Sequence, residues 1–187
     1  MNSRHSNHKI KRVLVLTSNQ VGVVDFCRIL LEYEDVQIYA AEEAYNFLKT
    51  ARVDLNSICK FTGLPCSLDA TMEILQLDIL EALLLNKEKH KHQKHINDKK
   101  RKLIDLLIVN FEDHFEIEAG KISAISVAAA NSSRVAVAMD EADYDRILTD
   151  MSKTDGAVTE NSRKFLAIKS LKTAAEHIKQ AASFLVG

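Results

Sequence analysis

Short apolar runs alternate with amphipathic segments along the chain, a pattern typical of a sheet covered by helices. Residues 13–16 (VLVL) form a β-branched-rich run that predicts a strand buried on both faces. Similar runs predict strands at 36–40, 103–109 and 135–139, with a brief extended piece at 57–61. Apolar residues at helical spacing predict helices at 21–33, 42–52, 68–85, 142–151 and 158–185. Residues Thr17-Ser18-Asn19 offer N-cap side chains before the first of these helices.

Strands that alternate with helices pair in parallel through right-handed crossovers. The sequence therefore predicts an α/β fold, a doubly wound and mostly parallel five-stranded sheet. Ligands of such sheets bind at the carboxyl ends of the strands, so candidate functional residues are sought there.

Length and composition fit one globular domain: 187 residues, 47% hydrophobic and 27% charged, with a net charge of −1. Residues 1–10 are polar and basic, which predicts a flexible tail before a single domain at 11–187. No apolar run is long enough to span a bilayer and no secretory signal is evident, so we expect a cytoplasmic protein without membrane contact. The small net charge gives no general attraction to nucleic acid.

The three cysteines, Cys27, Cys59 and Cys66, form no CxxC pair. We therefore expect buried or half-buried thiols in a reducing compartment, with neither a disulfide framework nor a zinc site.

A Lys- and His-rich segment occupies residues 87–102. A metal site is disfavoured because His90, His92 and His95 lack the i, i+4 spacing and a completing carboxylate pair. A nucleic-acid arm is disfavoured because no aromatic residues are interleaved. A solvated helix end or exposed loop is the interpretation we favour.

Several short strings follow one another in a specific order. Residues 18–26 read SNQVGVVDF, 61–65 read FTGLP with Asp69 after them, and 104–110 read IDLLIVN. AAAN at 128–131 precedes a predicted strand and Asp143-Tyr144, and Arg163, Leu166, Ala167 and Lys169 follow in the last helix. Together they resemble the IMP cyclohydrolase domain of the bifunctional purine biosynthesis protein, which has a methylglyoxal synthase-like fold.

The resemblance implies several properties. The activity would be dehydrative closure of formylaminoimidazole carboxamide ribonucleotide to IMP, in a domain that pairs with a second copy. The formyltransferase domain that normally follows is not expected within a chain that ends at Gly187.

The family's phosphate-binding residues are replaced. Its glycine-rich S-T-G-G-T loop corresponds to residues 40–44, AAEEA, so Glu42 and Glu43 stand in place of two glycines. An unpaired carboxylate opposing a phosphate costs several kcal/mol at ~4 Å and an effective dielectric near ~20. Acidic side chains in the first turn of a helix are, by contrast, favoured by its dipole. The phosphate site is therefore expected to be lost.

Other family positions have changed as well. Glu73 and Asp78 replace two family lysines, while a further lysine and an arginine correspond to Ala130 and Ser126. The candidate catalytic residues that remain are Asn110, Glu118 and Asn131. Candidate ligand-binding residues are Ser18, Asn19, Thr62, Gly63 and Asp69. Each also has a structural interpretation as a cap, a turn residue or a strand-end hydrogen-bonding group.

The sequence therefore favours a catalytically degenerate relative of the cyclohydrolase domain that acts through protein contacts as a homodimer, with no cofactor and no metal. One alternative is an active cyclohydrolase with a rebuilt site. Another is a small-molecule-sensing domain, like the regulatory domain of carbamoyl phosphate synthetase. A purine nucleotide is the possible ligand of an active enzyme, although its phosphate site is expected to be lost. For a sensing domain we expect a neutral or cationic ligand, because Glu42 and Glu43 disfavour anions.

Overall fold

A computed structural model describes residues 8–66, 70–98, 102–112 and 117–186. Most of the predicted tail lies outside these ranges. The described part of the fold begins close to the body: Lys9 forms an isolated bridge with Ala157, and Ile10 is buried. Across the described stretches, every helix is too short or too polar to cross a membrane.

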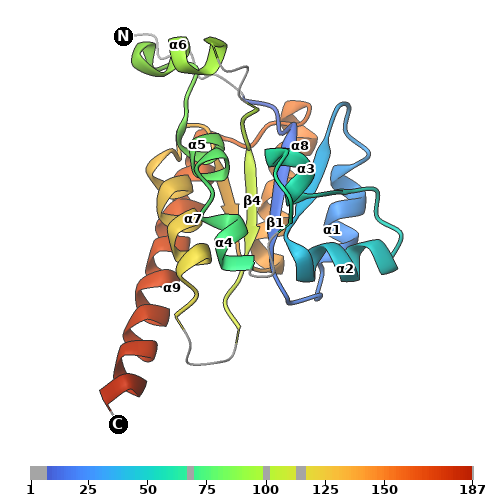
Figure 1. The fold of residues 1–187 in the computed structure, drawn as a ribbon. Helices are drawn as coiled ribbons and strands as arrows, with labels where there is room; N and C mark the ends of the chain where they lie inside the picture. The colour runs from blue at the N-terminus through green and yellow to red at the C-terminus, as the bar shows by residue number, and fades with distance from the viewer. Residues whose placement is uncertain (1–7, 67–69, 99–101, 113–116, 187) are drawn as a thin grey trace.

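Five parallel strands form one sheet in the order β3-β2-β1-β4-β5 (Figure 1). The strands are β1 (Arg12–Leu16), β2 (Gln37–Ala40), β3 (Asn56–Ser57), β4 (Leu106–Val109) and β5 (Ala136–Ala138). In the central ladder Val13 is in register with Ile38 of β2 and with Leu106 of β4. The predicted doubly wound α/β sheet is confirmed, and all of its strand pairs are parallel.

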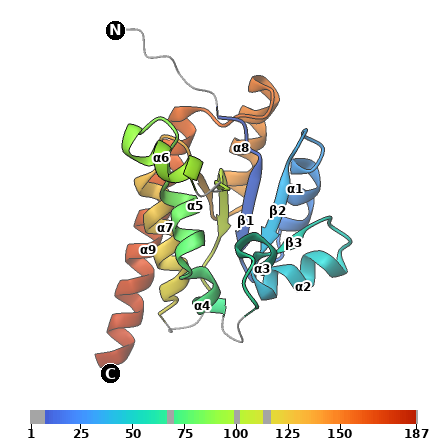
Figure 2. The same cartoon turned by 45° about the horizontal axis from the view of Figure 1, so that its top comes forward.

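Helices cover both faces of the sheet because successive strand residues point to opposite sides (Figures 1 and 2). Val13 and Val15 pack with α1 (Val23–Leu30), α2 (Glu42–Thr50) and α8 (Glu141–Thr154). Leu14 and Leu16 face the other core. That core is formed with α3 (Ile58–Thr62), α4 (Ala70–Ile74), α5 (Leu77–Leu84), α7 (Ala119–Ala130) and α9 (Glu160–Val186).

The helix α6 (His90–Asp98) belongs to the Lys- and His-rich segment. Most of its described side chains are exposed, and Ile96 packs with Leu85 and Leu103 in a small separate cluster. His95 Nε2 lies 2.9 Å from Glu81 Oε1, and the backbone N–H of Asn86 donates to His92 Nδ1 at 3.1 Å. Residues 90–98 thus form a helix on the surface.

Some predicted elements differ from the observed ones. The helix expected at 68–85 is interrupted where Gln76 adopts an extended ψ of 137°, so α4 and α5 are separate within the described residues. The extended piece at 57–61 is shorter, because the Ser57 hydroxyl accepts a hydrogen bond from the Lys60 N–H and caps α3. The α7 helix was not predicted, since its AGKISAISVAAA sequence is small and apolar on several sides.

The N-cap prediction for the first helix was wrong. Gly22, at a φ of 68°, precedes α1, and no side chain caps this end. Asn19 Oδ1 instead accepts the Val21 N–H at 2.9 Å, two residues before the helix. A side chain at Gly22 would collide with Glu141, since an added Cβ would lie 2.8 Å from its Cγ.

Candidate functional site

The carboxyl ends of β1 and β4 meet at the centre of the sheet, where the strand order changes direction. Thr17 follows β1 and Asn110 follows β4, and the Thr17 hydroxyl donates a hydrogen bond to Asn110 Oδ1. Asn110 is therefore held at the topological switch point, where doubly wound sheets bind ligands.

Glu118 lies just before α7, near the carboxyl end of β4 that Asn110 follows. Glu118 Oε1 accepts the backbone N–H of Glu112 at 2.9 Å, and its other oxygen forms an ion pair with Lys121. His177 of α9 reaches the same place: its Nε2 is 4.0 Å from Glu118 Oε1. Its ring stacks on Phe111, with 4.1 Å between ring centroids. The arrangement gathers an acid, an ammonium and an imidazole.

Lys121 and His177 were not singled out from the sequence. Lys121 follows Gly120 in the first turn of α7, and His177 lies on the distant C-terminal helix. The packing of α7 against α4 places this end of α7, because a Cβ at Gly120 would lie 3.3 Å from the Thr71 Cα. Only the tertiary fold brings α9 to the same edge.

The first turn of α2 carries Glu42 and Glu43 at the carboxyl end of β2. A small cavity of about 30 Å³ lies between this turn and the switch point, lined by Leu16, Thr17, Ala41, Glu43, Ala44, Ile74 and Lys121. The Lys121 ammonium already has two carboxylate neighbours, Glu118 and Glu112, the latter at 3.6 Å. The space is too small for a nucleotide.

A larger cavity of about 490 Å³ lies on the other side of β2. It is lined by Ala40, Glu42, Tyr45, Asn46, Ser57, Ile58, Cys59, Cys66 and Glu73. Two carboxylates face it, and no lysine or arginine is among these lining residues. The cavity is therefore acidic.

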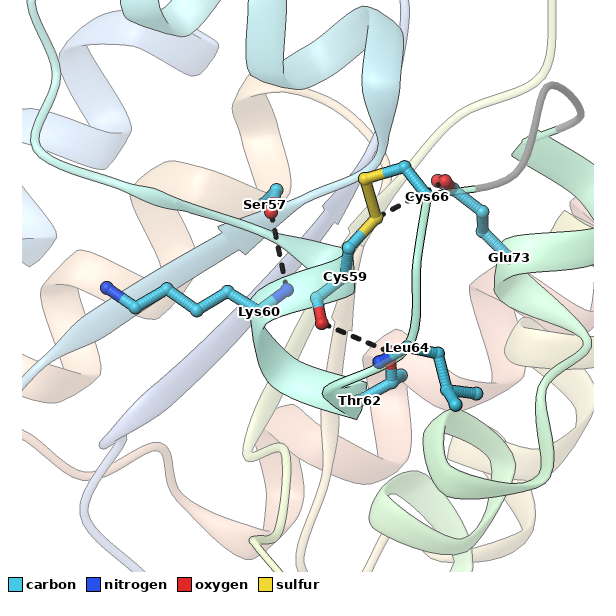
Figure 3. Close-up of a disulfide and its surroundings, with 7 residues drawn as sticks. All are labelled: Ser57, Cys59, Lys60, Thr62, Leu64, Cys66 and Glu73. Atoms are coloured by element: carbon cyan, nitrogen blue, oxygen red, sulfur yellow. Dashed lines mark hydrogen bonds between the residues drawn. A yellow bond between two sulfur atoms is a disulfide. The ribbon is translucent and has the colours of Figure 1, made fainter.

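Cys59 and Cys66 form a disulfide at the wall of this cavity (Figure 3). The expectation of three free thiols was wrong for this pair, because a helical turn and the following loop bring residues seven apart to a Cα–Cα distance of 5.3 Å. Cys27 is a buried free thiol, and burial raises its pKa to about 12.

Asn131 lies at the opposite edge of the sheet from Asn110 and Glu118. Its side-chain NH₂ donates to the Leu83 carbonyl at 2.7 Å, and its Oδ1 accepts from Asn86 Nδ2 at 3.3 Å. Because α7 runs from the carboxyl edge back to the amino edge, its two ends cannot share one small substrate. The structure thus brings together two of the three candidate catalytic residues.

The candidate ligand-binding residues are divided between two places. Ser18 is half-buried and Asn19 exposed in the turn after β1. The Thr62 hydroxyl accepts the Leu64 N–H at 3.3 Å, and Gly63 ends α3 in a left-handed conformation with φ 75°. Asp69 lies outside the described residues. The hydrogen bonds of Asn19 and Thr62 are internal turn contacts.

The sheet order and the helix layers define a methylglyoxal synthase-like α/β domain. The solved structure of ForH superimposes with a TM-score of 0.78, covering 93% of this chain and 98% of ForH at 20% sequence identity. This likeness is one of fold.

The sequence relatives are bifunctional purine biosynthesis proteins, PurH. The chain is 34% identical to that of Chlorobium chlorochromatii, over 97% of this chain and 37% of the relative. Identity to the Halalkalibacterium halodurans protein is 30%, over 94% of this chain and 37% of the relative. The chain thus spans a little over a third of these relatives' length, and no protein-family model matches it. The resemblance read from the motifs is confirmed: the chain is related to the IMP cyclohydrolase region of PurH.

Proposed function

We propose that this chain is an IMP cyclohydrolase-like domain of the purine-biosynthesis type that has lost catalysis and acts through contacts with another protein chain. The acidic turn at the carboxyl end of β2 carries this proposal. Glu42 lines the large cavity and Glu43 the small one, where the family's glycine-rich loop would approach a phosphate. A phosphate dianion would meet carboxylates from both sides of this turn.

Among the described residues that line the two cavities, no cation is left unpaired to offset this charge. Lys121 is the basic residue that borders the small cavity, and it is already paired with Glu118. The Lys- and His-rich helix α6 lies on the connection toward the amino end of β4, away from the acidic turn (Figure 1).

Ring closure measured by ultraviolet absorbance tests the loss of catalysis. We expect the purified chain to close formylaminoimidazole carboxamide ribonucleotide no faster than buffer, and millimolar IMP to leave its melting temperature unchanged. Turnover that disappears in Glu118→Ala would contradict the proposal. It would instead support an active enzyme with a rebuilt site, the alternative favoured by the grouping of Glu118, Lys121 and His177.

A face of α9 supports association with a second copy of the chain. Ile168, Leu171 and Ile178 are 57%, 44% and 41% exposed. With the exposed Ala175 and Ala182 they recur at alternating intervals of three and four residues, the spacing of a coiled-coil seam. The buried positions of α9, including Leu166 and Ala174, face the domain instead. We propose that this face pairs two chains in a homodimer.

Light scattering coupled to size exclusion tests this pairing. The wild-type chain should have the mass of a dimer, and Ile168→Glu with Ile178→Glu should give a folded monomer, since two charges would enter the apolar seam. Leu77→Glu is the matched control, because Leu77 is 64% exposed on α5. A monomeric wild type, or a dimer unaffected by the double change, would exclude the α9 interface.

A further inference from the structure

The wall of the large cavity places two sulfur atoms and a buried carboxylate together. The potential ligand atoms of Cys59, Cys66 and Glu73 all lie within 4.8 Å of one another (Figure 3). Cys59 Sγ is 3.4 Å from Glu73 Oε1, and Glu73 is only 2% exposed. Within the described residues, this is the group of three such side chains with the spacing of a metal site.

We propose that the reduced Cys59–Cys66 pair and Glu73 bind one thiophilic divalent cation such as Zn²⁺, and that the disulfide is the metal-free state of the same site. Sulfur and carboxylate oxygen are both zinc ligands in proteins.

The geometry suits a tetrahedral ion. With Zn–S near ~2.3 Å and Zn–O near ~2.0 Å, a sulfur and an oxygen on one zinc lie about 3.5 Å apart, and two sulfurs about 3.8 Å. The observed sulfur–oxygen separation of 3.4 Å already matches. The two sulfurs have to move apart. Cys66 can do this readily because it is exposed in the loop after α3.

The charge of the reduced site also favours a cation. Opening the disulfide would leave two ionisable thiols beside a carboxylate that is almost completely buried. Several negative groups in a partly buried place are stabilised by a metal ion, which also deprotonates coordinating thiols.

The exchange between the two states is balanced. A dithiol reductant is oxidised to its own disulfide, while each cysteine sulfur gains one electron and one proton. The cation then replaces both thiol protons, which are released to solvent. Three protein ligands leave a fourth position for water or a ligand in the cavity, where Ser57 and Asn46 also lie.

Titration with Co²⁺ tests the site, because cobalt bound to cysteine sulfur absorbs light through sulfur-to-metal charge transfer, whereas cobalt bound only to histidine does not. This difference separates the site from the histidines of residues 87–102. Chain treated with a phosphine reductant should bind one Co²⁺ with this absorbance, and Zn²⁺ should displace it. The oxidised chain should show none.

Variants assign the ligands. Cys66→Ser should abolish the charge-transfer band, and Glu73→Gln should weaken Co²⁺ binding at least tenfold while keeping part of the band. Cys27→Ala is the matched control, because Cys27 lies in the core on the opposite face of the sheet. The charge-transfer band of this variant should equal that of the wild type. The proposal is overturned if the reduced chain shows no band, or if Cys66→Ser keeps it. Neither measurement depends on ring closure, so this proposal and the proposed function fail separately.

Discussion

A buried arginine, Arg134, joins the amino ends of the central strands. Its guanidinium donates to the carbonyls of Leu85, Ile104 and Ala82 and contacts Asp105 at 3.0 Å. Asp105 in turn accepts the backbone N–H of Arg12 at 3.0 Å. Burial lowers the pKa of Arg134, an effect opposed by the neighbouring Asp105. These contacts satisfy backbone groups where α5, β4 and β1 converge.

Replacing Arg134 by Met should lower the free energy of unfolding by about 3–5 kcal/mol, because buried carbonyls and the Asp105 carboxylate each lose one hydrogen-bond partner. Urea denaturation measures the change. Arg28→Met is the control: this exposed residue pairs with Asp25 at 3.0 Å on the surface, so we expect a loss below about 1 kcal/mol. Equal losses in the two variants would show that Arg134 has no special role.

Asp150 gives stability a dependence on acid pH. Its Oδ2 accepts the Thr159 N–H at 2.9 Å and the Thr159 hydroxyl at 2.7 Å. Burial raises the pKa of Asp150, but the hydrogen bonds from Thr159 and Ser162 outweigh it, so the pKa lies below 3.8. A carboxyl group with a depressed folded-state pKa stabilises the fold above its unfolded pKa, and this contribution is lost as pH falls through the folded value.

Asp150→Asn should therefore cost about 1 kcal/mol at neutral pH, since the carboxylate is only half-buried. The difference from wild type should shrink below pH ~4. Thermal unfolding followed across this range measures it, and a difference that is constant with pH would contradict the assignment.

At the scale of single residues, the sequence predicted the role of a side chain where that role depends only on neighbouring residues in the chain. The acidic residues Glu42, Glu43 and Glu73, at positions where the family strings have glycine or lysine, were visible in the sequence itself. The disulfide could not, because spacing alone does not show that a helical turn brings Cys59 to Cys66. Asn131 matched a family string, yet its amide binds main-chain groups at the amino edge. Only the course of α7 in the structure shows that Asn131 lies away from Asn110 and Glu118.

Among the elements, α2 has the clearest consequence for ligand binding. Two carboxylates in its first turn interact favourably with the helix dipole, each by about 0.3–1 kcal/mol. The same charges repel an anion at the place where a helix N-terminus would otherwise attract one. Stability and phosphate binding are thus opposed in this turn.

Glu42→Gln with Glu43→Gln should lower the unfolding free energy by about 1 kcal/mol and make the melting temperature more sensitive to inorganic phosphate. The matched control is Glu32→Gln with Glu34→Gln, which removes the same charge from two exposed residues outside this turn. Phosphate sensitivity that rises equally in both variants would reflect net charge alone.

Elements with a clear apolar period were found from the sequence, and the others were not. The strands β2, β4 and β5 lie within the predicted runs, and β1 begins one residue before its run. The helices α2 and α8 lie close to their expected bounds. The α7 helix is rich in alanine and packed on several sides, so no amphipathic stripe marked it. At the break between α4 and α5, Gln76 has an extended ψ of 137°, which apolar periodicity does not predict.

For the whole molecule, the alternation of strands and helices predicts that the strands pair in parallel, whereas their order is known from the structure. We expect the stability of the elements to follow their place in this order. Amides of Leu14 and Leu107, in the two central strands, are buried on both faces. We expect them to exchange with deuterium only through global unfolding, whereas most amides of α6 exchange through local opening. Exchange measured by NMR tests this, and α6 protection equal to that of β1 would contradict it.

The ends of the sheet restrict how copies of the chain can join. The outermost strands, β3 and β5, are two and three residues long, so each offers at most a few main-chain groups for pairing with a strand of another chain. Pairing of these edge strands between two copies of the chain is therefore disfavoured, and so is aggregation through the sheet edges. We therefore expect an assembly of this chain to use side chains on the helices, so that surface substitutions would determine which partner chain it accepts.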